Sequence, residues 1–84
     1  MAEVEIGKVT DFFSRPVVAA IELTDELKVG DKIKIKGHTT ELEFVVNSMQ
    51  IHNESVSIAK AGDAVGIKVS EKVRHGDRVF KVTE

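Results

Sequence analysis

The 84-residue sequence contains no cysteine, which excludes a disulfide framework, a thiol nucleophile and cysteine-ligated zinc or iron–sulfur sites. It has no tryptophan or tyrosine and only four phenylalanines, so we expect no aromatic platform for stacking nucleic-acid bases. The formal net charge of −2 at pH 7 argues against binding of duplex DNA through overall positive charge. Hydrophobic residues, at 42%, are too frequent for a disordered tail.

Long apolar segments are also missing. No run approaches the ~18 consecutive apolar residues that a membrane span needs, and no apolar stretch with a basic flank indicates a signal or transit peptide. We therefore expect no membrane association and a cytoplasmic location. The high charged content of 31%, with one glutamine and two asparagines, is typical of heat-adapted proteins. A chain of 84 residues predicts a single domain over residues 1–84.

The hydrophobic residues favour strands. Valine and isoleucine supply 20 of the 35 hydrophobic residues, and branching at Cβ suits a pleated sheet better than a helix. Apolar and polar residues alternate in runs separated by turn signals. The one helical candidate, a single turn, is Thr24 to Lys28. The first expected strand contains Val4, Ile6 and Val9, is interrupted at Gly7 and is followed by Phe12 and Phe13. The other expected strands are 17–23, 32–36, 40–49, 56–58, 65–69 and 79–82.

This pattern predicts an all-β fold. Short strands without room for crossover helices imply antiparallel pairing, and a small barrel hides strand edges best. We therefore expect a six- to seven-stranded antiparallel β-barrel, with a two-sheet sandwich as the alternative. Turns are expected at 14–16 and 37–39, and the long run 40–49 requires a bulge or bend. In the run 32–36, the isoleucines should face inward and the lysines outward.

The dipeptide Gly-Asp precedes an alternating run three times, at Gly30-Asp31, Gly62-Asp63 and Gly76-Asp77. The spacing is irregular, so these are not solenoid repeats. Glycine adopts positive φ angles readily, and an aspartate can accept a hydrogen bond from nearby backbone. We predict three turns of similar chemistry and not a set of catalytic carboxylates.

Motifs for catalysis are absent. No phosphate-binding loop or dinucleotide fingerprint occurs, so no nucleotide or other cofactor is expected. His38, His52 and His75 lie in predicted turns without metal-ligand spacing, so no metal site is expected. No serine lies in a nucleophile elbow. We therefore expect no catalytic residues and no enzymatic activity.

Two groups of basic residues are candidate RNA contacts. Lysines at alternate positions of one strand can follow a phosphate backbone, but they also protect a strand edge from pairing with other chains. Arginines in the last connection, beside His75, can bind phosphate or carboxylate in a bidentate manner. The candidate residues are Lys32, Lys34, Lys36, Lys72, Arg74 and Arg78.

Four apolar residues are candidate protein contacts. Phe12 and Phe13 stand side by side before a turn, and Met49 and Ile51 flank another predicted turn. A flexible methionine suits a recognition surface. The alternative is that these side chains close the ends of the core.

Several segments resemble the second domain of elongation factor Tu, the β-barrel that translational GTPases share. They are 6–9, 17–23, 27–35, 45–50, Ala59 to Val69 and Val73 to Val79. The segment 45–50 resembles the family's strand that ends in a methionine near the barrel rim. The likeness covers nearly the whole chain. Asp11 to Pro16 replaces the family's glycine-rich opening. The sequence most resembles small stand-alone translation elongation factor-like proteins, which are related to a barrel appended to prokaryotic collagenase-like peptidases.

The resemblance implies a function. In the factors, this barrel contacts ribosomal RNA and helps to form the pocket for the aminoacylated end of tRNA. The chain shows neither a GTPase nor a peptidase domain, so we expect neither factor activity nor proteolysis. Our leading hypothesis is a non-enzymatic binding module that contacts RNA or the ribosome. The alternative is a protein-interaction or accessory domain that works with a separately encoded enzyme, such as a collagenase-like peptidase.

Overall fold

The computed structural model describes residues 2–14, 17–38 and 40–83, and the described residues form ten strands and no helix. The all-β prediction is therefore confirmed, although there are more strands than the six or seven expected. The predicted turns at 14–16 and 37–39 lie partly outside the described residues. The strands are β1 (Ala2–Ser14), β2 (Val17–Leu23), β3 (Leu27–Lys28), β4 (Lys32–Lys36), β5 (Glu41–Val45), β6 (Met49–Ile51), β7 (Glu54–Val56), β8 (Ile58–Ala59), β9 (Ala64–Lys68) and β10 (Arg78–Thr83).

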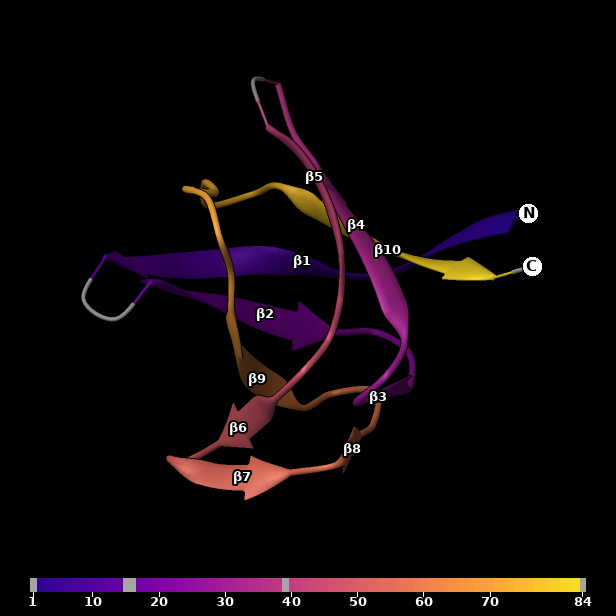
Figure 1. Cartoon of the computed structure of the whole chain (residues 1–84), viewed down its shortest axis with the longest axis vertical. Coiled ribbons are helices and arrows are strands. Elements are labelled where there is room, and N and C mark those ends of the chain that lie inside the picture. Colours follow the sequence, from indigo (N-terminus) through magenta and orange to yellow (C-terminus); the bar gives the residue numbers. More distant parts are fainter. Residues whose placement is uncertain (1, 15–16, 39, 84) are drawn as a thin grey trace.

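Eight strands form one sheet in the order β5-β4-β10-β1-β2-β9-β6-β7, and β3 pairs with β8 (Figure 1). All pairs are antiparallel, as predicted. The sheet curls around the core, but its pairing stays open: among the described residues, β5 pairs only with β4 and β7 only with β6. The expected closed barrel is therefore not found. The predicted helical turn at Thr24 to Lys28 is wrong, because Leu27 and Lys28 pair with β8.

The core consists mainly of β-branched side chains that alternate along the strands. In β4, Ile33 and Ile35 are fully buried while the lysines between them face outward, which confirms the predicted alternation. In β2, Ala19, Ile21 and Leu23 point into the same core. Among the described residues, no helix has the length and apolar character needed to cross a membrane.

The long run 40–49 is divided at Val46 to Ser48, an interruption of the kind expected somewhere in a run of this length. Leu42 and Phe44 pack against the core as the alternation predicts. Strict alternation along this run would place Val46 and Met49 on opposite faces, but both side chains are buried. The irregular segment between β5 and β6 shifts the alternation of inward and outward side chains, so the Met49 side chain points into the core.

Strand β1 does not stop at Gly7 but passes it with a change of register. Its pairing with β10 shifts between Glu5 and Gly7, and its pairing with β2 shifts between Val9 and Asp11. A Cβ atom at Gly7 would lie 2.5 Å from the carbonyl oxygen of Glu22. Glycine is needed here because the two backbones approach too closely for a side chain.

The three Gly-Asp dipeptides form three turns with the same hydrogen bonds, at 28–31, 60–63 and 74–77, which we call the Gly-Asp turns. The φ angle of each glycine lies between 92° and 99°. Each aspartate carboxylate accepts a hydrogen bond, at 2.9 Å, from the backbone N–H of the residue three positions earlier. The predicted turn chemistry is confirmed.

Each Gly-Asp turn is also attached to one buried residue of a neighbouring segment. That residue's carbonyl accepts a hydrogen bond from the glycine N–H, and its own N–H donates to the aspartate carbonyl, at distances of 2.7–2.9 Å. The three attached residues are Val46, Leu23 and Val9. The repeated dipeptide therefore anchors three connections to the core.

Candidate binding surfaces

The lysines of β4 lie on an outward face that we call the charged face, formed by β1, β10, β4 and β5. Each lysine is within ion-pair distance of a carboxylate on another strand. The pairs are Lys32–Glu43 at 3.3 Å, Lys34–Glu41 at 3.8 Å and Lys36–Glu3 at 2.8 Å, and Arg78 lies 4.0 Å from Glu5. Exposed pairs of this kind contribute about 0–1 kcal/mol each. The lysine row is thus part of an alternating pattern of charge and not an isolated basic strip.

The pair between Lys36 and Glu3 is the tightest of these contacts. The hydrogen bond from Lys36 lowers the pKa of Glu3 below its ordinary value of 4.5. The same bond raises the pKa of Lys36 above its ordinary value of 10.5. The Lys36 ammonium also lies 5.4 Å from the ring centroid of Phe80, within the range of a cation–π contact. Several neighbours therefore hold this lysine in place.

The second basic group lies in the connection before β10. Lys72 and Arg74 are exposed there, and Arg78 pairs in register with Lys36, which brings the two basic groups together. His38 and His75 line one shallow hollow near this point. The described residues contain no group of three His, Cys, Asp or Glu side chains that could hold a metal ion.

The four candidate protein contacts do not lie on one surface. Phe13 is 50% exposed, but Met49 is only 1% exposed and belongs to the core. Phe12 and Ile51 are partly buried and pack against the same core. On β1, Phe12 pairs with Ala19, which faces inward, whereas Phe13 pairs with Val18. Met49 is therefore wrong as a surface contact, and Phe13 is the most accessible of the four side chains.

Phe13 stands beside an outward surface of small apolar residues, which we call the Phe13 patch. It consists of Phe13, Val18, Ala20, Ala64 and Gly66 and borders a hollow of about 470 Å³. Gln50, His52 and Asn53 line its polar rim. The patch was not predicted, although the sequence carries a signal for it: outward positions of β2 and β9 are occupied by alanine, valine and glycine, where charged residues are usual.

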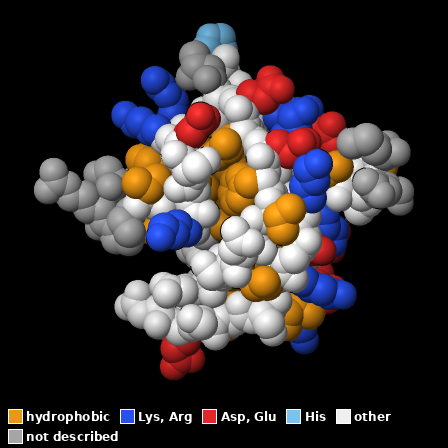
Figure 2. Space-filling model, in the orientation of Figure 1, with side chains coloured by type: hydrophobic (Ala, Val, Ile, Leu, Met, Phe, Trp, Pro, Cys, Tyr) orange, Lys and Arg blue, Asp and Glu red, His pale blue; other side chains and the backbone are white. Residues whose placement is uncertain are grey.

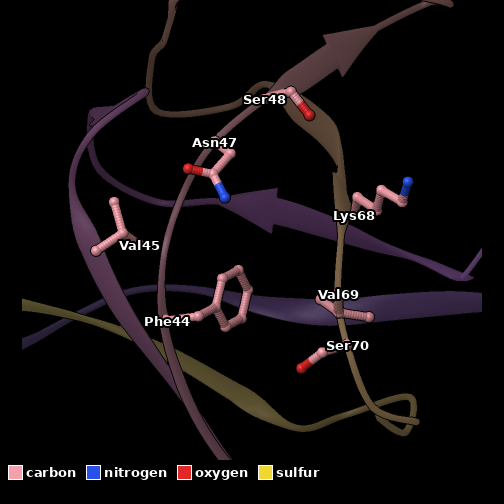
Figure 3. Close-up of a pocket in the computed structure, with 7 residues that line it drawn as sticks. All are labelled: Phe44, Val45, Asn47, Ser48, Lys68, Val69 and Ser70. Atoms are coloured by element: carbon pink, nitrogen blue, oxygen red, sulfur yellow. The ribbon is translucent and has the colours of Figure 1, made fainter.

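A third hollow, of about 400 Å³, lies between β5 and the end of β9, and we call it the β5–β9 groove. Figure 2 shows apolar side chains at the bottom of a hollow in this face, with charged side chains around it. In Figure 3, the Phe44 ring points across the groove toward Val69, and the Asn47 amide and Ser70 hydroxyl lie at its two ends. The groove thus has an apolar floor with neutral polar groups at its ends, and Lys68 lines it on the β9 side.

One wall of the groove is the unpaired edge of β5. The hydrogen bonds from Gly37 N–H to Thr40 O and from Val46 N–H to Asp31 O fix which residues of the β4–β5 pair are bonded. Bonded pairs alternate along an antiparallel ladder. The backbone groups of Leu42 and Phe44 therefore face β4, and those of Glu41, Glu43 and Val45 face away from it. This edge is not evident from the sequence, whose pattern predicted a closed barrel without free strand edges.

The fold and these surfaces define a small all-β domain in which Asp77 is the one charged residue, among those described, that is buried. No family model matches the chain. It is 49% identical over 83 residues to an uncharacterized protease of Methanocaldococcus jannaschii, covering 98% of the chain and 20% of that protein. It is 35% identical over 81 residues to a collagenase of Porphyromonas gingivalis, covering 94% of the chain and 20% of the collagenase. The chain thus spans about a fifth of the length of these curated relatives.

Two solved structures have a similar fold. The C-terminal domain of a predicted U32 peptidase from Geobacillus thermoleovorans superposes with a TM-score of 0.88 at 14% sequence identity. The match covers 95% of this chain and 93% of that domain. A selenomethionine variant of the same domain has a TM-score of 0.84. At this identity the likeness shows the shared fold alone.

These comparisons correct the sequence-based identification. The likeness to the second domain of elongation factor Tu is wrong as an assignment, because the relatives are named as a protease and collagenases and the matching folds are peptidase domains. The expected contact with RNA or the ribosome has no support from them. The charged face gives a physical argument against RNA contact through β4. The lysines of β4 already face carboxylates, so they do not form an uncompensated positive strip for phosphate groups.

Proposed function

We propose that this chain is a non-catalytic accessory domain that works with the catalytic part of a collagenase-like peptidase of the U32 type. The alternative hypothesis from the sequence also named an accessory domain, but one whose enzyme is separately encoded. The observation that carries the proposal is that 98% of the chain matches only 20% of a protease at 49% identity. A segment of that size is a small part of the peptidase, and the matching solved fold is a C-terminal domain.

The Phe13 patch is the surface that we assign to contact with the catalytic part. Phe13 is 50% exposed, and its neighbours in the patch are small and apolar. Apolar patches with a polar rim are typical of protein interfaces, and aromatic side chains dominate their binding energy. The charged face fits this role less well, because its charges are compensated within the chain.

The test is binding between this chain and the Methanocaldococcus jannaschii protease from which the matching segment has been removed. We expect association by isothermal titration calorimetry, together with restored hydrolysis of a gelatin substrate. The exposed half of a phenylalanine corresponds to about 75–125 Å², or about 2–3 kcal/mol when buried. Phe13→Ala should therefore weaken binding by up to about 30- to 150-fold.

Ile58→Ala is the matched control, because Ile58 is 42% exposed but lies on β8, away from the patch. It should leave the dissociation constant unchanged. Absence of any association would refute the accessory role. Association that Phe13→Ala does not weaken would refute only the assignment to the Phe13 patch.

A further inference from the structure

The unpaired edge of β5 presents backbone hydrogen-bonding groups to the β5–β9 groove. The N–H and C=O groups of Glu41, Glu43 and Val45 face away from β4, as the β4–β5 hydrogen bonds require. Beyond them, the chain at Lys68 to Ser70 has left the pairing that joins β9 to β6 at Met49 and Gln50. Two segments of backbone therefore diverge and leave a gap in the sheet.

The gap has the chemistry of a strand-binding site. Its floor is apolar, with the Phe44 ring and Val69 lying opposite each other (Figure 3). Its volume of about 400 Å³ is within the usual range of ligand pockets, ~300–1,000 Å³. An extended peptide that pairs with a free edge gains main-chain hydrogen bonds, and its alternate side chains enter the groove. The inward side chains of such a peptide would meet Phe44 and Val69, which favours apolar residues.

The outward side chains of the added strand would lie beside the carboxylates of β5. Glu43 lies 3.3 Å and Glu41 3.8 Å from the lysines of β4, and the Glu41 side chain is 77% exposed. Opposite charges on neighbouring strands stabilise a pair, and like charges destabilise it. A second copy of β5 would place glutamates against glutamates. A strand with basic residues at these positions instead continues the alternation of lysines on β4 and glutamates on β5.

We infer that the free edge of β5 binds an extended peptide segment in which basic and apolar residues alternate, with the apolar side chains directed into the β5–β9 groove. The bound segment adds a strand next to β5 and fills the gap beside β9. This inference is independent of the proposed function, because the Phe13 patch is formed by β1, β2 and β9 and contains none of these groups.

The test uses the full chain and capped synthetic peptides of about seven residues, long enough to span β5. One peptide alternates lysine with valine, and a second alternates glutamate with valine. Two further peptides have the lysine sequence with N-methyl groups on alternate amides: in one the odd-numbered amides are methylated, and in the other the even-numbered amides. We expect the lysine peptide to bind about tenfold or more tightly than the glutamate peptide, measured by fluorescence anisotropy. N-methylation should abolish binding in one register, because it removes the amides that pair with β5.

Variants of the chain locate the site. Glu41→Lys with Glu43→Lys should reverse the preference between the two charged peptides, whereas Glu54→Lys, on the other sheet edge at β7, should leave it unchanged. Val45→Pro removes one edge N–H and should weaken binding of the lysine peptide about tenfold. Circular dichroism confirms that each variant is folded. Equal binding of the charged peptides, binding that survives N-methylation in both registers, or reversal by Glu54→Lys would each overturn the inference.

Discussion

The Gly-Asp turn at 74–77 allows a stability prediction that depends on burial alone. Asp77 is 6% exposed, and its carboxylate accepts a hydrogen bond from the Arg74 N–H at 2.9 Å. The same bond in the first turn, from Lys28 N–H to Asp31, is exposed. The bond at Asp77 is part-buried. A hydrogen bond to a charged group contributes about 1.5–3 kcal/mol, and a donor that water reaches poorly is not fully resolvated when its partner is removed. We expect Asp77→Ala to cost about 2–3 kcal/mol.

The corresponding cost of Asp31→Ala should be about 1 kcal/mol, because water can replace the carboxylate at an exposed N–H. For a domain of this size, 1 kcal/mol corresponds to about 4–8 °C in Tm. Urea denaturation followed by circular dichroism measures the free energy of unfolding of both variants. Asp77→Asn should lose only about half as much stability as Asp77→Ala, because its amide oxygen can accept the same hydrogen bond. Equal losses for Asp77→Ala and Asp31→Ala would refute the reasoning from burial.

Two further predictions concern backbone packing and charge. Gly7→Ala should destabilise the chain by about 2 kcal/mol or more in the same denaturation assay, because its Cβ would lie 2.5 Å from the Glu22 carbonyl oxygen. Lys36→Met should return the pKa of Glu3 toward 4.5, as NMR titration of the Glu3 carboxyl would measure. Because that pKa is lowered in the folded chain, the pair stabilises it above pH 4.5 and the effect is lost as pH falls through the lowered pKa.

Each of these two predictions has a matched control in the chain. Gly66→Ala adds the same methyl group to β9, where the Cβ would lie 3.3 Å from a side-chain carbon of Val18 and 4.0 Å from the carbonyl oxygen of Gln50, so the loss should be smaller than at Gly7. Lys32→Met removes the lysine that faces Glu43 and should leave the Glu3 titration unchanged. A similar loss from both glycine substitutions, or a Glu3 pKa that does not respond to Lys36→Met, would contradict the stated contacts.

Local chemistry in the sequence predicted the parts of the fold that neighbouring residues determine. The boundaries of β2 and β4 and the inward isoleucines follow from alternation within one strand. The three Gly-Asp turns follow from the φ preference of glycine and the reach of an aspartate side chain. All of these depend on interactions within a few residues.

What the sequence did not predict depends on how distant segments meet. The irregular segment after Val45 shifts the alternation, so Met49 is buried together with Val46 although strict alternation would place them on opposite faces. The free edge of β5 and the Phe13 patch arise because strands far apart in the sequence pair or diverge. The lysine row could not be interpreted from β4 alone, since its carboxylate partners come from β1 and β5.

The charged face has a consequence for how other molecules approach this domain. Lys32, Lys34 and Lys36 each lie within 4 Å of an opposite charge, so the fields of the partners largely cancel at distances beyond the screening length of about 8–10 Å. Diffusing macromolecules would experience neither attraction nor repulsion from this side until they touch it. Association on this face is therefore expected to have little long-range electrostatic steering, and charge acts there only between groups in contact, such as the β5 carboxylates and a strand added beside them.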